Sequence, residues 1–266
     1  MKYSGQISKM NTSLNATVQY ELPINNHCIN LNQYIGSMIE ITFDNQIHCI
    51  KCNVSIKKTF MQGYCYPCFI SIPETSECIL KPHLCKAHEG ISRNIEWSKI
   101  HCLTDNYIYL SLTSNLKVGV TRSTQIPTRW IDQGAHQAIK FAKTPNRYLA
   151  GMIELELSKH ISDRTQWRAM LKGEYDKSIN LIIEKKNLSK LIPPEYTQYI
   201  NNNTDILHIA YPGNVKFEKI KSINLHKHSN IKGRFVGVKG QYLIIDNEFV
   251  FNVRKYTGYT ITLNFT

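Results

Sequence analysis

The placement of the cysteines constrains this chain more than any other feature of its sequence. All eight lie between Cys28 and Cys102, and the longer remainder of the chain has none. A small secreted scaffold held by disulfides spreads its cysteines throughout, whereas a cluster in one segment of an intracellular chain is typical of metal ligands. We therefore expect a metal-binding segment in a cytoplasmic protein.

Two Cys-x-x-Cys pairs, Cys49 with Cys52 and Cys65 with Cys68, predict the first metal site. Each pair can direct two thiolates at one tetrahedral zinc ion, and a hairpin between the pairs brings them together. The alternatives are a redox pair or buried free thiols. Since four thiolates leave no coordination position open, we expect this zinc to be structural.

A second group of metal-ligand residues follows, without a Cys-x-x-Cys pair. It predicts a second zinc site with three thiolates and one imidazole. The opposing interpretation is that the cysteines are small core residues and the histidines lie on the surface. The predicted ligands are Cys78, Cys85, His88 and Cys102, with His83 and His101 as alternatives for the imidazole.

The chain is strongly basic. Its 266 residues include 32 Lys and Arg against 20 Asp and Glu, which gives a formal net charge of +12. Such an excess attracts polyanions, so DNA or RNA is the expected partner. The alternative is a low-GC genome, which encodes lysine freely, since Asn and Ile are also abundant in this chain. No apolar run approaches the roughly 18 to 20 residues of a membrane helix, so no membrane contact is expected.

Alternating patterns and turn residues predict an α+β chain with four parts. Residues 1–104 are expected to form a β-segment with the zinc-binding module, a zinc ribbon, and residues 105–175 a central α/β core. Residues 176–204 are expected to be a helical connector. Residues 205–266 contain short strands with interleaved Tyr, Lys and Arg, which predict a small β-barrel-like module that contacts single-stranded nucleic acid.

The central core carries the groups that phosphodiester hydrolysis requires. Two strands are predicted at 107–112 and 116–121, and a helix after Pro127 holds Arg129 in its first turn. Glu154 lies inside a second, amphipathic helix. A carboxylate can hold Mg²⁺ or Mn²⁺, a guanidinium can clamp phosphate, and a tyrosine can help to activate water. An ordinary salt bridge is the alternative role for Arg129 and Glu154.

This core resembles the GIY-YIG nuclease superfamily, in particular its phage-type branch. The resemblance rests on Tyr107-Ile-Tyr109, Lys117-Val-Gly119, Arg129 and Glu154, in that order. It implies a GIY-YIG-like fold in which Tyr109, Arg129 and Glu154 are catalytic. Gly119 matches the glycine of the second motif and is assigned to substrate binding.

The sequence departs from the superfamily pattern at two positions. Tyr107 replaces a glycine of the first motif, and Lys117 replaces a tyrosine of the second. Lys117 can hold a phosphate as a point charge, so it remains a candidate for substrate binding. Arg122, directly after the second strand, is a further candidate for phosphate contact, with a pair to Asp132 as the alternative.

Over its whole length the chain also resembles a bacterial family defined as a domain of unknown function. The stretches that carry this resemblance are Gln62–Cys68, Leu116–Arg122, Ile126–Ala135 and Lys239–Leu243. Three functional hypotheses follow from the sequence. The first is a zinc-binding endonuclease that acts on nucleic acid, the second is a catalytically degenerate DNA or RNA adaptor, and the third is a zinc-stabilised scaffold for protein interactions.

Overall fold

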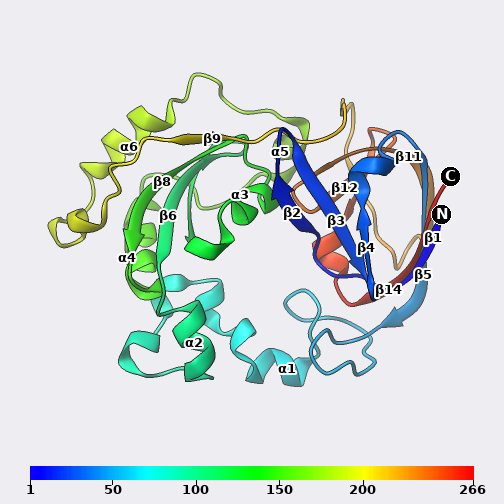
Figure 1. Ribbon diagram of the computed structural model, residues 1–266, viewed down its shortest axis with the longest axis horizontal. Helices are drawn as coiled ribbons and strands as arrows, with labels where there is room; N and C mark the ends of the chain where they lie inside the picture. The colour runs from blue at the N-terminus through cyan, green and yellow to red at the C-terminus, as the bar shows by residue number, and fades with distance from the viewer. The chain divides into compact units, whose positions relative to one another are not determined.

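The computed structural model describes residues 1–266 and consists of two compact units (Figure 1). Unit 1 comprises Met1–Ile70 and Ala210–Thr266, and unit 2 comprises Ser71–Ile209. The fold is a mixed α/β structure with several sheets, 27% helix and 34% strand. These units differ from the four predicted parts, because the boundary at residue 70 falls between the two groups of cysteines.

Strands from both ends of the chain build the main sheet of unit 1. All neighbouring strands in it are antiparallel except the last pair, which is parallel. Alternation of apolar and polar residues places one face of each long strand in the core. The order is β1 (Lys2–Gln6), β14 (Tyr259–Phe265), β5 (Met38–Ile47), β11 (Asn230–Lys239), β12 (Tyr242–Ile245), β13 (Phe249–Asn252) and β10 (Lys221–Ser222).

The predicted C-terminal barrel is not confirmed. The four strands expected after residue 230 are present as β11 to β14, but no closed barrel is detected, and β14 and β11 pair with β5 from the N-terminal part. Sequence patterns identify the strands but not their partners, and these partners are remote in the chain. A second sheet of unit 1 contains β2 (Asn11–Leu14), β3 (Val18–Ile24) and β4 (His27–Asn30).

Unit 2 contains a four-stranded antiparallel sheet in the order β7 (Leu116–Arg122), β6 (Asn106–Leu112), β8 (Gln137–Thr144) and β9 (Ile206–His208). The predicted strands at 107–112 and 116–121 are confirmed as β6 and β7. The pattern after residue 121 predicted helices, so the strand β8 between two of them was missed. Most of β8 is buried, so it lacks the alternation that marks a half-exposed strand.

Helices α4 (Arg147–Leu157) and α6 (Leu181–Ser189) pack against this sheet. The expected helix after Pro127 is α3 (Thr128–Asp132), and the amphipathic helix is α4. Asn146 caps α4, since its side chain accepts from the Leu149 N–H. The apolar side of α4 packs on β6 and β8 around Ile108 and Phe141. The remaining helices of unit 2 are α2 (Ile95–His101) and α5 (Trp167–Lys172), whereas α1 (Tyr66–Ser71) lies almost entirely in unit 1.

The predicted connector is part of the core of unit 2. Its helix α6 buries Leu181 and Leu188 against the sheet, and the Asn201 N–H donates to the Phe141 carbonyl. Helical structure in this stretch is therefore confirmed, and it packs against β8 instead of only linking two domains.

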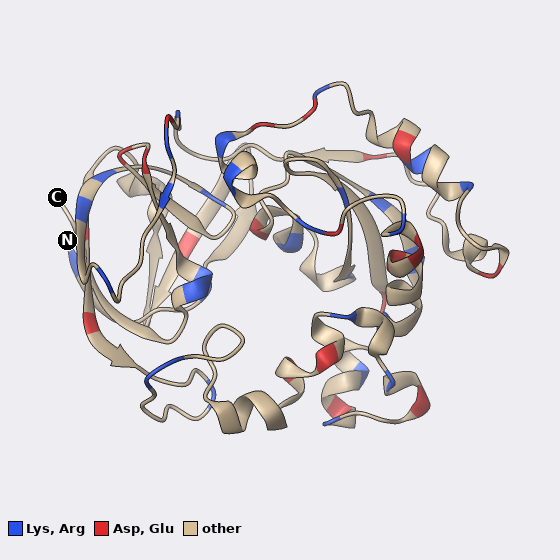
Figure 2. Ribbon diagram, turned by 180° about the vertical axis from the view of Figure 1, so that it is seen from behind, with Lys and Arg blue, Asp and Glu red and all other residues tan.

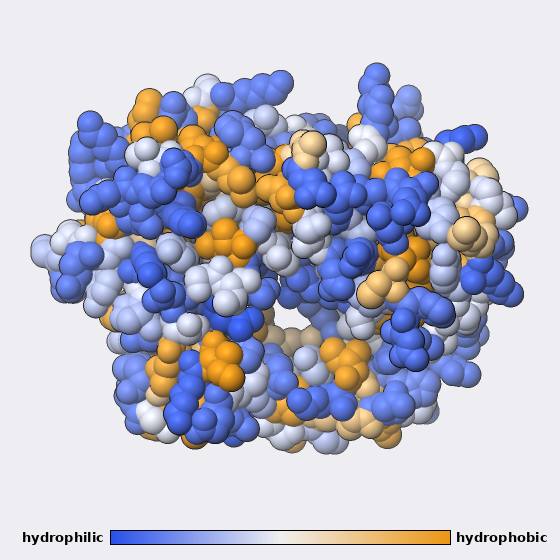
Figure 3. All heavy atoms as spheres, in the orientation of Figure 1, coloured by the Kyte–Doolittle hydropathy of each residue, from blue (hydrophilic) through white to orange (hydrophobic).

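The surface is mostly polar, and its positive charges are distributed over both units. Lys and Arg occur along both units (Figure 2), and hydrophilic side chains cover most of the face in Figure 3, between small apolar patches. No helix is both long enough and apolar enough to span a membrane.

Candidate metal centres and candidate active site

The four cysteines of the two Cys-x-x-Cys pairs meet in unit 1. The Sγ atoms of Cys49, Cys52, Cys65 and Cys68 all lie within 4.8 Å of one another. Two tight turns position them. The Cys49 N–H donates to the Val54 carbonyl, and a bridge between Phe60 and Tyr64 closes the turn before the second pair. We call this group the four-cysteine cluster.

The electrostatic environment of this cluster suits a cation. Burial raises the pKa of the Cys49 thiol, but backbone N–H donors at Cys52, Cys65 and Lys51 outweigh burial and lower that pKa to about 6. The pKa of Cys68 is raised to about 12, because hydrogen bonds with the neighbouring sulfurs favour its protonated form. Four sulfurs that compete for protons in this way fit a tetrahedral zinc ion, which replaces the protons by metal–sulfur bonds.

The segment that carries this cluster has almost no core of its own. Between residues 48 and 70 the only buried side chains are those of Cys49 and Cys65, whereas Val54, Tyr66 and Ile70 are exposed. A segment that buries so little apolar surface needs another source of stability. The cluster therefore fits the structural role predicted for it.

A second group of cysteines meets in unit 2. The Sγ atoms of Cys78, Cys85 and Cys102 also lie within 4.8 Å of one another. Cys85 and Cys102 are 3% and 1% exposed and form part of a small cluster with Ala87, Trp97 and other partners. We call this group the three-cysteine cluster. Like the four-cysteine cluster, it could hold zinc.

The imidazoles predicted for this second site do not join it. The His88 ring stacks on Tyr148 with 4.3 Å between ring centroids, and the His101 ring stacks on Trp97 at 3.8 Å. His101 Nδ1 is also 2.8 Å from the Trp97 carbonyl oxygen. The structure thus brings together three of the four predicted ligands and leaves out His88.

Basic residues border the three-cysteine cluster. Hydrogen bonds with the sulfurs of Cys78 and Cys85, together with the Arg147 guanidinium, hold the pKa of Cys102 well below its usual range. Arg122 lies in the same electrostatic neighbourhood, because burial and the positive charge of Arg147 lower its pKa while Cys102 opposes them. Arg122 was predicted to bind substrate together with Lys117 and Gly119. The charged groups that act on it are instead Arg147 and Cys102, at the three-cysteine cluster.

Tyr109 and Gly119 face each other across β6 and β7. Tyr109 is fully buried, and the two residues are directly paired in the sheet. A Cβ atom at position 119 would lie 2.5 Å from the Tyr109 hydroxyl oxygen, which is closer than real Cβ contacts allow. Gly119 is therefore required for the tyrosine hydroxyl to occupy its place, a close approach that only glycine permits.

Arg129 reaches the same hydroxyl through Gln133 of the following turn. The Gln133 amide lies 2.7 Å from the Tyr109 hydroxyl. When its nitrogen faces that hydroxyl, its oxygen accepts from Arg129 Nε and Nη2, both at 3.3 Å. Burial raises the pKa of Tyr109, so the phenol stays protonated at neutral pH.

Glu154 approaches this group from α4, beside the edge strand β7. Burial and the negative charge of Asp163 raise its pKa to about 7, although Arg129, Lys117 and a hydrogen bond with the Val120 backbone act in the opposite direction. Because each of these groups affects the titration of Glu154, its carboxylate shares an electrostatic site with Arg129 and Lys117.

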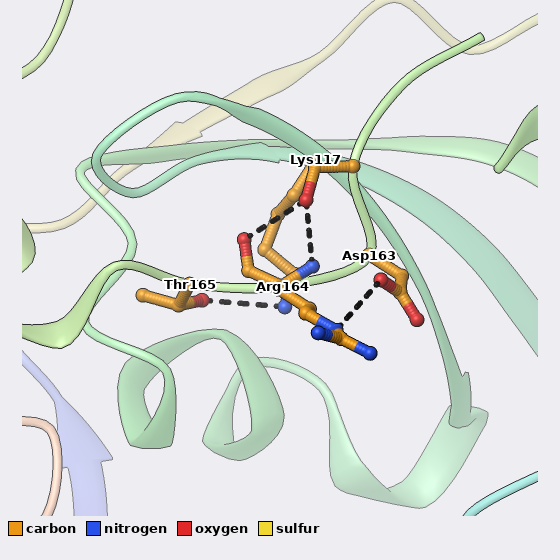
Figure 4. Close-up of polar contacts among 5 residues, drawn as sticks. Lys117, Asp163, Arg164 and Thr165 are labelled. Carbon is orange, nitrogen blue, oxygen red and sulfur yellow. Dashed lines mark hydrogen bonds and ion pairs between the residues drawn. The ribbon is translucent and has the colours of Figure 1, made fainter.

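Lys117 lies under the segment 162–165 and is only 4% exposed. Its Nζ donates to Thr165 Oγ1 at 3.3 Å (Figure 4). The Val118 N–H donates to the Ser162 carbonyl. Burial and the charge of Arg129 lower its pKa to about 8. Lys117 is therefore a covered cation whose charge is sensitive to pH near neutrality.

Sequence reasoning missed three members of these sites. Gln133 and Asp163 lie near Tyr109 and Glu154, and Arg147 lies beside the three-cysteine cluster. Gln133 is one helical turn after Arg129, so the spacing of four residues was a usable signal. Nothing local distinguishes Asp163 or Arg147, because tertiary packing brings them to their partners.

One comparison with known proteins gives a match. A family model described as "Protein of unknown function (DUF2797)" matches residues 36–261, which include both cysteine clusters and the residues around Glu154. No curated protein and no solved structure matches the chain.

Proposed function

The chain belongs to the DUF2797 family, and for this member we propose a nucleic-acid-acting function in which unit 2 cleaves phosphodiester bonds. The observation that carries this proposal is the convergence of Tyr109, Arg129 and Glu154 beside the edge of β7, with Lys117 in the same electrostatic site. A phenol, a guanidinium and a carboxylate from three separate elements in one place are typical of a site for phosphoryl chemistry.

The arrangement of the elements supports the resemblance to GIY-YIG nucleases. β6 is central and antiparallel to both β7 and β8, α3 supplies Arg129, and α4 follows β8 and supplies Glu154. The close contact of Gly119 with Tyr109 gives a physical reason for a glycine in the second motif. These features support a GIY-YIG-like core in residues 105–175.

The chemistry of the site fits one divalent cation. Mg²⁺ is usually bound by one or two carboxylates together with phosphate oxygens and water, and Glu154 offers one partly buried carboxylate. Bound Mg²⁺ or Mn²⁺ would supply Lewis-acid stabilisation of the phosphate. Only the ionised carboxylate of Glu154 binds a cation. Because the pKa of Glu154 is raised to about 7, cation binding should depend steeply on pH near 7.

The other residues have roles that follow from their charge state. The Arg129 guanidinium stays cationic and can clamp phosphate oxygens. The Tyr109 hydroxyl stays protonated, but it is fully buried and hydrogen-bonded to Gln133, so it positions Gln133 and Arg129 and would contact water or phosphate only if these neighbours moved. Lys117 is covered by Thr165, so it acts on the site through its charge unless segment 162–165 moves.

The charge of the whole chain supports a nucleic-acid partner, since +12 is spread over both units. Zinc in the cysteine clusters would stabilise the units that contact the polymer, and a cytoplasmic location fits eight free thiols. Most aromatic side chains of β11 to β14 are buried in the core, and only Tyr242 and Phe249 are partly exposed, so base stacking on these strands would be limited to those two rings.

A cleavage assay tests the proposal. Purified zinc-loaded protein is incubated with labelled single-stranded, duplex and branched DNA and RNA, with Mg²⁺, with Mn²⁺ and with a chelator. We expect cutting that requires the divalent cation and falls at least about 100-fold in Glu154→Gln and Arg129→Ala. Glu156→Gln is the matched control, because Glu156 lies on the same helix and pairs with Lys159 at 2.6 Å. Equal cutting by Glu154→Gln and the wild type would contradict the assignment.

A second candidate function is a nucleic-acid adaptor without catalysis. It is favoured by Lys117, which stands where the resembling nucleases have a tyrosine and which is covered by segment 162–165. An adaptor binds nucleic acid equally well with and without Mg²⁺, and its affinity falls steeply with salt. Salt-insensitive, weak binding would instead favour the scaffold for protein interactions.

A further inference from the structure

We propose that the three-cysteine cluster of unit 2 binds zinc with one coordination position open, and that this position accepts a small thiol from solution. Three sulfurs are assembled there, and no His, Cys, Asp or Glu side chain adds a fourth ligand atom to this group. Zinc is usually four-coordinate, and a site with three protein ligands keeps its fourth position for water or an exogenous ligand.

Two histidines near the cluster are engaged elsewhere. His101 is held by the Trp97 ring and carbonyl, and the His88 ring lies on Tyr148. Closure of the site by either side chain would require it to leave these contacts. The ring nitrogens of His83 are not in the group of ligand atoms that the three sulfurs form.

A cavity adjoins the three sulfurs. It has a volume of about 410 Å³, and Cys78, Cys85 and Cys102 all contribute to its wall. Leu84 and Ile91 also line it and are exposed, so the cavity reaches the solvent. A fourth ligand that enters from outside therefore has space next to the metal position. The four-cysteine cluster has a complete set of protein ligands and needs no such space.

The chemistry of the wall favours a thiol. Zinc is a borderline-soft ion that binds sulfur and imidazole nitrogen well. The Trp97, Leu84 and Ala87 side chains give the cavity an apolar side that suits a short carbon chain. Three thiolates on Zn²⁺ leave a net negative charge, and the cations of Lys86 and Arg93 at the wall and Arg147 beside Cys102 offset the charge of one more thiolate.

Cobalt substitution tests this proposal on the full chain. Co²⁺ in thiolate sites absorbs by sulfur-to-metal charge transfer, which grows with the number of thiolates. We expect two Co²⁺ ions per chain. Adding 2-mercaptoethanol should raise the absorbance of the second ion by roughly a third, because a fourth thiolate joins three. The four-cysteine cluster is closed and should not respond.

Variants assign the response to the right cluster. Cys102→Ser should lose the response to thiol and retain one ion, whereas Cys28→Ser, at an exposed cysteine outside both clusters, should keep two ions and the full response. Binding of only one Co²⁺ per folded chain would overturn the proposal. Two ions without a response to thiol, together with a spectral change in His88→Ala or His101→Ala, would also overturn it, because the fourth ligand would then be an imidazole of the protein.

Discussion

The two cysteine clusters use the same ligand type in opposite settings. The four-cysteine cluster is built from local turns within a segment whose only buried side chains are Cys49 and Cys65. The three-cysteine cluster draws its sulfurs from positions 78, 85 and 102 and lies beside Ala87, Trp97, Leu103 and Tyr148, with a cavity at its side. A metal ion in the four-cysteine cluster would replace a hydrophobic core, whereas a metal ion in the three-cysteine cluster would lie beside an existing one.

This difference explains what could be read from the sequence. A Cys-x-x-Cys turn specifies its own geometry, so all four ligands of the first cluster could be named. In the second cluster the three cysteines were also named, but the choice of His88 as the fourth ligand depended on side-chain directions that spacing does not determine. His88 faces Tyr148 of α4, which lies 60 residues later in the chain.

The largest expected effect is the loss of the first metal ion. Cys49→Ser should remove one zinc ion per chain and unfold residues 48–70, because structural zinc in small modules contributes on the order of 10 kcal/mol of apparent binding free energy. Cys85→Ser should also remove one zinc ion but should cost less, about 2 to 4 kcal/mol, since the apolar neighbours of the second cluster remain. Zinc content by elemental analysis and hydrogen exchange in each segment measure both changes.

Cys28→Ser is the control for a cysteine substitution as such, and we expect it to retain both ions. The comparison between the clusters fails if Cys49→Ser leaves residues 48–70 as protected from exchange as in the wild type. It also fails if Cys85→Ser destabilises the chain more than Cys49→Ser does.

The next largest effect is kinetic. A chelator can attack a zinc ion through an open coordination position, whereas four protein thiolates must be displaced one at a time. We therefore expect zinc to leave in two phases, with the three-cysteine cluster at least about tenfold faster. A colorimetric chelator follows the release, and Cys102→Ser should lack the fast phase. A single phase in the wild type would show that the two clusters are equally closed.

The candidate active site shows the same division between local and tertiary information. Tyr109, Gly119, Arg129 and Glu154 could be named from short motifs, and the structure brings them together around one buried hydroxyl. The missed β8 and the missed Asp163 have a common cause, since neither carries a local pattern. Arg122 was assigned to the substrate because it directly follows the predicted strand 116–121. It is the last residue of β7, and this end of the strand lies near Cys102 and Arg147.

The smallest expected effect is a change in the stability of unit 2 with pH. Because burial raises the pKa of Glu154 from 4.5 to about 7, the folded chain binds more protons than the unfolded chain between these values. The free energy of unfolding therefore falls as pH rises through this window. Glu154→Gln removes this dependence, so the variant should be more stable than the wild type by about 1 to 2 kcal/mol at pH 8 and nearly equal at pH 5.

Urea unfolding at pH 5 and pH 8, with zinc present, measures the difference in the free energy of unfolding of unit 2 between Glu154→Gln and the wild type. Glu156→Gln should show no such dependence, because Glu156 pairs with Lys159 just beyond the end of the same helix. Loss of zinc at low pH acts oppositely, since protonation of the thiols weakens both clusters as pH falls. A stabilisation of Glu154→Gln that is the same at pH 5 and pH 8 would contradict a buried, titrating carboxylate.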